Sequence, residues 1–135
     1  MKEIKLKQIY KNNPTLFKLL KRADFLLISK EMSAGVTGLV LQARKRDLNE
    51  NLPERIIRVG YTCSKKVGNA VVRNRSKRRL REIGLKLLSI YGVPGWDYVL
   101  IARYKDTVNI PFNKLEESFI IAINKIHKYK FQGLK

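Results

Sequence analysis

The sequence predicts a single α+β domain with a mixed β-sheet and three helices, and three observations lead to that prediction. The chain has 135 residues, of which 44% are hydrophobic, enough for one domain with a core of its own. Strand-like alternation at 56–63 is followed by a long amphipathic segment at 69–91. An apolar run at 96–103 and a second amphipathic segment complete the expected order α-β-β-β-α-β-α.

The N-terminal segment is expected to lie outside this domain. Residues 1–21 are rich in lysine and are interrupted by Asn12-Asn13-Pro14, which indicates a loosely ordered basic arm with at most a fragment of helix at Leu16–Leu20. We expect the domain itself to span residues 22–128 and a short tail to follow at 129–135.

A short amphipathic helix is expected at the start of the domain, over residues 22–31. Phe25, Leu26 and Ile28 provide its apolar positions. Asp24 falls in its first turn, where a carboxylate interacts favourably with the positive end of the helix dipole.

Two of the three strands that follow can be located. Residues 36–43 mix β-branched and aliphatic side chains, and residues 56–63 alternate strictly between apolar side chains and a second set. That second set consists of Arg58, Gly60 and Thr62. Because a glycine weakens a strand but lets another group approach closely, this face is expected to form either a groove or a simple bulge.

The main helix is expected at 69–91 and ends at Gly92 and Pro94. At ~100° per residue, its two arcs differ sharply in character. The small and apolar arc contains Val72, Ser76, Leu80, Ile83, Gly84, Leu87 and Leu88. The opposite arc contains Asn74, Arg75, Arg78, Arg79 and Arg81.

The last two elements complete the core. The almost continuously apolar run at 96–103 fits an interior strand. After Pro111, apolar side chains recur at helical spacing from Phe112 to Ile126, which predicts a closing amphipathic helix.

The charge of the chain indicates a polyanionic partner. Lysine and arginine total 29 against 11 aspartate and glutamate, a net charge of +18 whose self-repulsion a nucleic acid would relieve. Six of the nine positions at 73–81 are basic, and planar guanidinium groups suit phosphate oxygens. A helix face that is merely solvated usually carries acidic residues among the basic ones, so that i,i+4 ion pairs can form. In this segment only Glu82 supplies a carboxylate. We therefore favour phosphate binding.

Several other classes of protein are disfavoured. No apolar run approaches the ~18 residues of a membrane span, and the charged start lacks the apolar stretch of an export signal, so we expect no membrane partner and a cytoplasmic location. Cys63 is the single cysteine and is expected to be a small core residue, which excludes an internal disulfide. His127 is the single histidine and is expected to be exposed or near a helix cap.

A protein nuclease would need clustered carboxylates for metal ions or a histidine-based acid–base pair. The carboxylates of this chain are scattered, so we expect neither catalytic side chains nor a protein-bound metal. A ribosomal-type or chaperone-like RNA-binding protein fits the composition as well as any RNA-processing factor does.

Three stretches closely resemble the bacterial ribonuclease P protein subunit, and the resemblance extends over about residues 20–126. The stretches are Arg58-Val-Gly, Ser64-Lys-Lys-Val-Gly-Asn-Ala-Val-Val-Arg-Asn-Arg-Ser-Lys-Arg-Arg-Leu-Arg-Glu and Asp97-Tyr-Val-Leu-Ile-Ala-Arg. The resemblance implies a left-handed strand–helix–strand crossover through the main helix, against the usual rule. It also implies a protein cofactor of a catalytic RNA that removes the 5′ leader of precursor tRNA, with Mg²⁺ bound through the RNA and no obligate protein partner.

The same resemblance implies roles for particular residues. Contact with the catalytic RNA is expected for Lys65, Lys66, Arg73, Asn74, Arg75, Lys77, Arg78 and Arg81. A cleft for the single-stranded leader is expected to be lined by Phe25, Gln42, Arg58, Gly60 and Thr62. The family often carries aromatic residues where this chain has Ser29 and Gln42, so leader affinity is expected to be weaker, because a base stack contributes ~1–3 kcal/mol.

Overall fold

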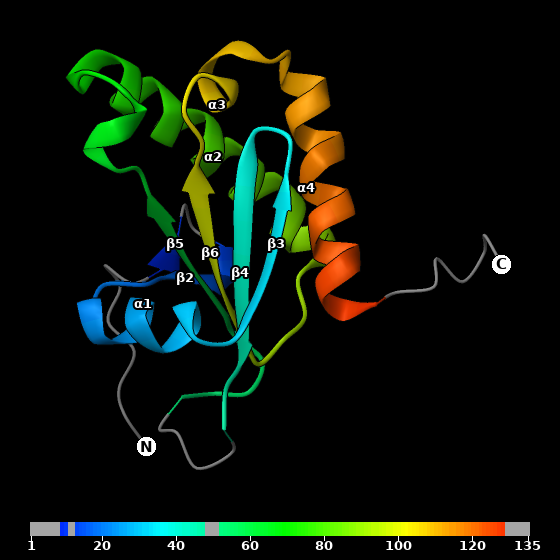
Figure 1. The fold of residues 1–135 in the computed structure, drawn as a ribbon. Coiled ribbons are helices and arrows are strands. Elements are labelled where there is room, and N and C mark those ends of the chain that lie inside the picture. The colour runs from blue at the N-terminus through cyan, green and yellow to red at the C-terminus, as the bar shows by residue number, and fades with distance from the viewer. Residues whose placement is uncertain (1–8, 11–12, 48–51, 129–135) are drawn as a thin grey trace, which may run out of the picture.

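The structure, a computed structural model, describes residues 9–10, 13–47 and 52–128. Within these ranges the chain forms a mixed sheet, as predicted, and its helices lie on both faces of that sheet (Figure 1). The described residues contain one short helix more than the three that the sequence predicted. In chain order the elements are β1 (Ile9–Tyr10), β2 (Asn13–Lys18), α1 (Arg22–Ser29), β3 (Met32–Val36), β4 (Leu39–Lys45), β5 (Ile57–Thr62), the 3₁₀ turn η2 (Lys65–Val67), α2 (Ala70–Tyr91), β6 (Trp96–Ala102), α3 (Asp106–Asn109) and α4 (Phe112–His127).

The described strands lie in the order β1-β2-β5-β6-β4-β3. β2, β5 and β6 run parallel to one another, and β4 pairs antiparallel with both β6 and β3. The helix α2, which joins the neighbouring strands β5 and β6, passes behind the sheet in Figure 1, where β6 lies to the right of an upward-pointing β5. This connection is therefore left-handed, as the family resemblance implied and against the usual preference.

Of the three strands expected between the first helix and the main helix, β3 is the one that the sequence did not locate. It forms a hairpin with β4, in register from Met32 opposite Ala43 to Val36 opposite Leu39. The tight turn between the strands contains Gly38 at a φ of 93°, a conformation that glycine adopts without strain. The expected strand at 36–43 thus corresponds mostly to β4.

The prediction of a loose arm up to residue 21 is wrong for its last part, and the helix fragment expected at Leu16–Leu20 does not form. Residues 13–18 form β2, which pairs in parallel with β5. Leu16 and Phe17 are 1% and 4% exposed, so their burial and the strand pairing outweigh the local break. Pro14 is compatible with this strand because proline is tolerated near the start of a strand. The rest of the predicted arm, residues 1–8 and 11–12, lies outside the described residues.

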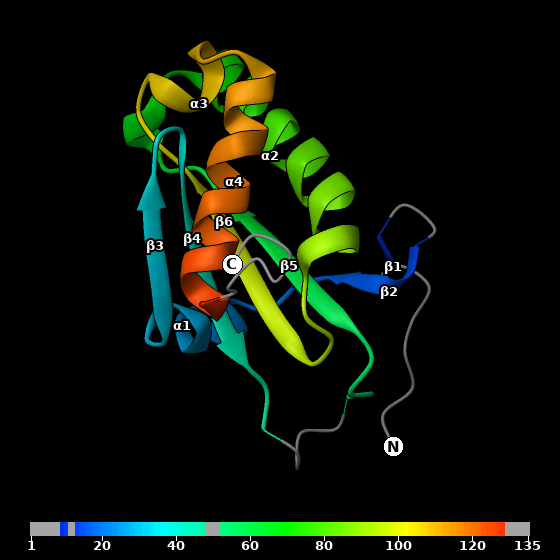
Figure 2. The ribbon, with the colours of Figure 1, turned by 90° about the vertical axis from the view of Figure 1, so that its right-hand side faces the viewer.

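The main core lies between the sheet and the helices α2 and α4, which pack side by side on one face (Figure 2). The predicted apolar arc of α2 is confirmed, because all its members except the partly buried Val72 are buried. Among the largest fully buried side chains are Tyr98 of β6 and Phe119 of α4. Because the buried arc of α2 packs into this core, the basic side of the helix is held in a fixed position on the domain.

A smaller core lies on the other face of the sheet, beneath α1. It consists of Leu19, Ile28 and Val99, with Phe25 and Ile101 packed partly against it. Since α1 has only eight residues, it covers only part of this face (Figure 1). The uncovered part of the sheet is where the candidate site begins.

Candidate nucleic-acid interface

A groove of ≈ 500 Å³ lies between α1 and the open face of the sheet. Side chains alternate between the two faces of a strand, so Gln42 of β4, Thr62 of β5, and Val99 and Ile101 of β6 all project into it. Three residues of the predicted leader cleft, Phe25, Gln42 and Thr62, line this groove. The complete lining is Leu20, Arg22, Phe25, Leu26, Ser29, Gln42, Thr62, Val99 and Ile101.

Gly60 does not line the groove, because the ring of Phe25 covers it. A Cβ atom at this position would lie 2.5 Å from Cε1 and Cζ of Phe25 and 3.1 Å from Cδ1 of Leu19. The missing side chain therefore lets an aromatic ring rest against β5. Gly60 is a buried support for Phe25, so it is not part of the lining to which the sequence analysis assigned it.

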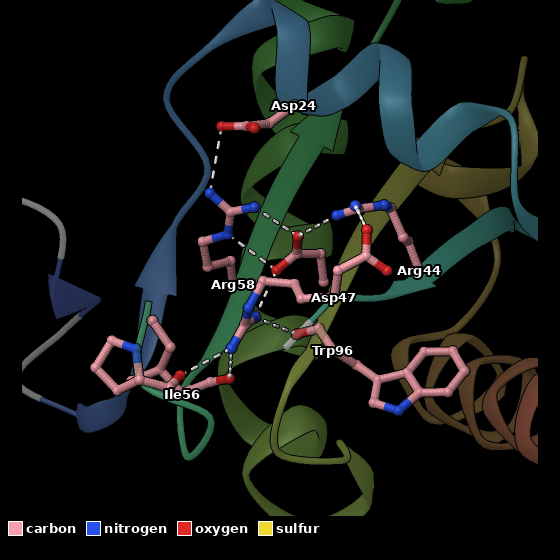
Figure 3. A network of polar contacts seen from close by, with 9 residues as sticks. Asp24, Arg44, Asp47, Ile56, Arg58 and Trp96 are labelled. Carbon is pink, nitrogen blue, oxygen red and sulfur yellow. Dashed lines mark hydrogen bonds and ion pairs between the residues drawn. The ribbon is translucent and has the colours of Figure 1, made fainter. Parts of the chain in front are cut away.

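Arg58 does not line the groove either, because two carboxylates hold its guanidinium group (Figure 3). Its Nε and Nη2 donate to Oδ1 and Oδ2 of Asp97 at 2.9 and 2.6 Å, a bidentate geometry, and its Nη1 donates to Oδ2 of Asp24 at 3.2 Å. Asp24 lies in the first turn of α1 and Asp97 in β6. Arg58 thus fastens α1, and with it Phe25, to the sheet.

Asp97 is the centre of a larger ionic cluster. Its side chain is fully buried, and it also pairs with Arg46 at 2.7 Å and with Arg44 at 3.9 Å. Arg46 donates further hydrogen bonds to the carbonyls of Pro53, Ile56 and Trp96. In the sequence Asp97 is one of several scattered acids, and its spacing from them indicates no cluster. One feature of the sequence does indicate the cluster, because Asp97 lies inside the apolar run at 96–103. A charge that is buried in a strand requires a partner of opposite charge.

The second part of the interface is the outward side of η2 and α2. We call this the basic surface and define it by Lys65, Lys66, Arg73, Asn74, Arg75, Lys77, Arg78 and Arg81. Arg73 and Lys77 are half-buried and the others are exposed. The helix begins at a regular cap, because Oδ1 of Asn69 accepts a hydrogen bond from the backbone N–H of Val72 at 3.0 Å. Six of the eight residues of the basic surface therefore lie on one regular helix, and Lys65 and Lys66 lie on the turn that leads into it.

Arg79 lies within the same run but has a structural role. Its Nη1 and Nη2 donate to the carbonyls of Thr107 and Ile110 at 2.9 and 2.6 Å, and its guanidinium carbon lies 5.7 Å from the ring centroid of Phe112. These contacts attach α3 to α2. Helical periodicity places Arg79 on the basic arc of the main helix, but residue spacing alone does not show which groups its side chain contacts.

The groove and the basic surface meet at the end of β5. Thr62 lines the groove and is the last residue of β5, and Lys65 opens η2 three residues later. Between them Cys63 packs partly against the main core, as expected, and burial raises the pKa of its thiol despite the nearby charges of Lys77 and Arg73. The groove and the basic surface are therefore joined by a short segment of the chain, from Thr62 to Lys65.

Comparison with known proteins settles the family. A family model described as "Ribonuclease P" matches residues 14–127. The chain belongs to the ribonuclease P protein family. The ribonuclease P protein component of Ruegeria pomeroyi is 51% identical over 112 residues, which cover 83% of this chain and 87% of the relative. That of Paramagnetospirillum magneticum is 39% identical over 112 residues, covering 82% and 83%.

Solved structures of ribonuclease P proteins share the fold. The protein from Staphylococcus aureus superposes with a TM-score of 0.62 at 29% identity, covering 82% of this chain and 94% of that one. The protein from Thermotoga maritima gives a TM-score of 0.63 at 30% identity, covering 77% and 92%. As a ribonuclease P protein component, the chain is a subunit of a ribonucleoprotein endoribonuclease that processes tRNA, and this membership implies association with an RNA subunit.

Within residues 9–10, 13–47 and 52–128, no three histidine, cysteine, aspartate or glutamate side chains gather in a way that could hold a metal ion. None of the helices in those ranges is both long enough and apolar enough to cross a membrane.

His127 of this ribonuclease P protein lies in the last turn of α4, as expected, but it is half-buried rather than exposed. Its Nε2 is 2.7 Å from the hydroxyl of Tyr98, which also accepts a hydrogen bond from the backbone N–H of Val93, and its ring lies edge-on to Trp96. Burial lowers the pKa of His127 below its ordinary value. The folded protein therefore favours the neutral imidazole.

Acidification is expected to weaken the fold through this histidine. Because the folded pKa is lower than the unfolded one, the unfolded chain takes up more protons as the pH falls. The contribution of neutral His127 to folding stability is complete above pH ~6.5, the pKa of a histidine in the unfolded chain. It is lost as the pH falls from that value through the lower pKa of the folded protein. The thermal midpoint should fall between pH 7.5 and 5.5 in the wild type and fall less in His127→Gln. Equal slopes in the two proteins would exclude His127 as the titrating group.

Proposed function

We propose that the chain is the protein cofactor that binds the catalytic RNA of ribonuclease P through the basic surface and holds the 5′ leader of precursor tRNA in the groove. The observation that supports this most is the continuity between the groove, at Thr62, and the basic surface, at Lys65. In this proposal the protein promotes endonucleolytic removal of the leader, in the cytoplasm, by bringing two RNAs together.

Electrostatics supports the first half of the proposal. Two RNAs repel each other through their phosphates, and a chain of net charge +18 offsets that repulsion. The exposed guanidinium groups of Arg75, Arg78 and Arg81 project from one rigid helix, where arginine forks suit phosphate oxygens. Contacts to phosphates position an RNA without reading its sequence.

The groove suits a single strand of RNA. The half-buried ring of Phe25 offers an aromatic surface for a base, while Gln42 and Thr62 offer hydrogen-bonding groups. Leu20 and Leu26 line the same groove and are 53% and 50% exposed. Ser29 supplies no stacking surface, and its hydroxyl donates to the carbonyl of Leu26 at 2.7 Å. Among the lining residues of the groove, Phe25 therefore supplies the stacking surface for a leader base.

In the proposed mechanism the protein positions the RNAs and performs no chemistry itself. Hydrolysis of the phosphodiester is assigned to the catalytic RNA, where bound Mg²⁺ would supply an activated water and charge neutralisation. The residues of the basic surface and the groove act before this step, by holding the leader and the catalytic RNA together.

Reconstitution tests the proposal directly. The protein, a cognate catalytic RNA and precursor tRNA are combined at low Mg²⁺, where the RNA alone is inefficient. Cleavage at the mature 5′ end that depends on the protein is the expected result. A ribosomal-type or chaperone-like RNA-binding protein would bind the RNAs without restoring cleavage at that site, and this outcome would reject the proposal.

Phe25→Ala is expected to weaken binding of precursor tRNA to the assembled particle by about one base stack, ~1–3 kcal/mol. Mature tRNA lacks the leader and should bind as before. Because Phe25 is only half-buried, the loss of folding stability should be smaller than the ~3–5 kcal/mol of a fully buried phenylalanine. The two measurements are the ratio of precursor to mature tRNA affinity and the thermal midpoint of the free protein.

Gly60→Ala is the matched variant, because it keeps the Phe25 side chain but displaces its ring through the contact at 2.5 Å. The affinity ratio should change in the same direction as in Phe25→Ala. If neither variant changes the ratio, the leader-binding role of the groove is wrong, whereas the role of the basic surface is unaffected.

A further inference from the structure

An exposed aromatic side chain with basic neighbours lies outside the predicted interface. Tyr104, in the turn between β6 and α3, is 62% exposed. Arg103 and Lys105 on either side of it are also exposed, and Nζ of Lys105 lies 5.3 Å from the centroid of the Tyr104 ring. An aromatic face beside cations is the combination that binds single-stranded RNA, because it serves both a base and its phosphates.

The turn that carries Tyr104 is firmly held. The backbone N–H of Arg103 donates to Oγ1 of Thr107 at 2.7 Å, and the hydroxyl of Thr107, which is fully buried, donates to the carbonyl of Gly38 at 2.6 Å. The carbonyl of Thr107 in turn accepts from Arg79 of α2. The turn is thus attached both to the β3–β4 hairpin and to the basic helix, so ordering it on binding costs little entropy.

The pairing of β5 with β6 shows where the turn that carries Tyr104 lies relative to the groove. Ile101 lines the groove and is paired with Thr62 across β5 and β6. Beyond this pair, β5 leads to Lys65 in η2 and β6 leads to Arg103. Two basic segments therefore flank the end of the groove at the Thr62–Ile101 pair, and Tyr104 belongs to one of them.

We propose that Tyr104 is a second stacking site for the single-stranded leader, where the leader passes the end of the groove at Thr62 and Ile101. One base stacks on the Tyr104 ring, and Arg103 and Lys105 neutralise neighbouring phosphates. The inference rests on the proposed binding of the leader in the groove. Tyr104 would supply a second aromatic surface for the leader. Among the lining residues of the groove the aromatic side chain is that of Phe25, and Ser29 and Gln42 offer no stacking surface.

The test uses the reconstituted particle and precursor tRNAs whose leaders increase in length. Tyr104→Ala should weaken binding by ~5–150-fold, the range of one base stack, once the leader is long enough to reach the turn, whereas Tyr104→Phe should bind like the wild type. Mature tRNA affinity and the thermal midpoint of the free protein should not change. Ile90→Ala is the control, because Ile90 is 66% exposed near the far end of α2 and should have no effect.

Two results would overturn the inference. One is wild-type affinity of Tyr104→Ala at every leader length. The other is weaker binding of the catalytic RNA alone, without substrate, which would assign the stacked base to that RNA. Phe25→Ala, measured in the same series, separates this inference from the proposed function: an effect of Phe25→Ala without one of Tyr104→Ala rejects only the second site, whereas no effect of either rejects leader binding as a whole.

Discussion

Asp97→Asn is expected to lower the free energy of unfolding by about 3–5 kcal/mol, the cost of removing one partner from a buried ion pair. The carboxylate is fully buried and lies within 4 Å of the guanidinium groups of Arg44, Arg46 and Arg58. The side chain of Arg46 is only 4% exposed, so the change would leave it as a buried charge without its counter-ion. The thermal midpoint should fall by roughly 10–20 °C in a domain of this size, as measured by circular dichroism.

Asp47→Asn is the matched control. Asp47 also pairs with Arg44, at 3.7 Å, but its side chain is 76% exposed. An exposed pair contributes at most ~1 kcal/mol, so this variant should melt close to the wild type. If Asp97→Asn were as stable as Asp47→Asn, the buried cluster would not be the attachment between the strands and α1 that its geometry indicates.

Replacing Arg75 and Arg78 together by alanine is expected to weaken binding of the catalytic RNA by roughly 10–100-fold near 0.1 M salt. Each lost phosphate contact should also reduce the slope of log affinity against log salt by ~0.7 for a single strand to ~0.9 for a duplex. Both side chains are exposed on α2, away from its buried arc, so the circular dichroism spectrum and thermal midpoint should be unchanged. The measurement is RNA affinity over a series of salt concentrations.

The control for this variant removes the same charge elsewhere. Lys125 and Lys128 are exposed at the end of α4, and neither belongs to the basic surface. Their double alanine variant should lose much less affinity and keep the salt slope of the wild type. Equal losses in the two double variants would show that total charge matters and that the basic surface has no special role.

The sequence predicted those features of the fold that follow from periodicity within one element. The buried arc of α2 is the clearest case, since helical spacing alone placed Ser76 and Gly84 on the inside. The strand β2 was missed because it forms only through pairing with β5, about 40 residues later in the chain. Local composition contains no information about such a partner, and a proline near its start suggested a break. The left-handed crossover was expected only from the family resemblance.

The sequence likewise predicted only part of the candidate site, namely which residues of β5 share a face. Alternation along β5 placed Arg58, Gly60 and Thr62 on one face, and they do lie on the face opposite the main core. Which of the three is open to the groove depends on α1, whose docking position cannot be derived from spacing. Phe25 covers Gly60, and Asp24 engages Arg58, so only Thr62 remains on the lining.

The order of strands in the sheet has a consequence for folding during synthesis. β6, the last of the described strands along the chain, lies between β5 and β4 in the sheet. Until it has left the ribosome, the β2–β5 pair and the β3–β4 hairpin have no strand to connect them, and three arginines lack the carboxylate of Asp97. The arginine-rich α2 precedes β6, so it emerges before the sheet can be completed. Folding of this domain should therefore be a late event that depends on long-range pairing, and long-range pairing is intrinsically slow.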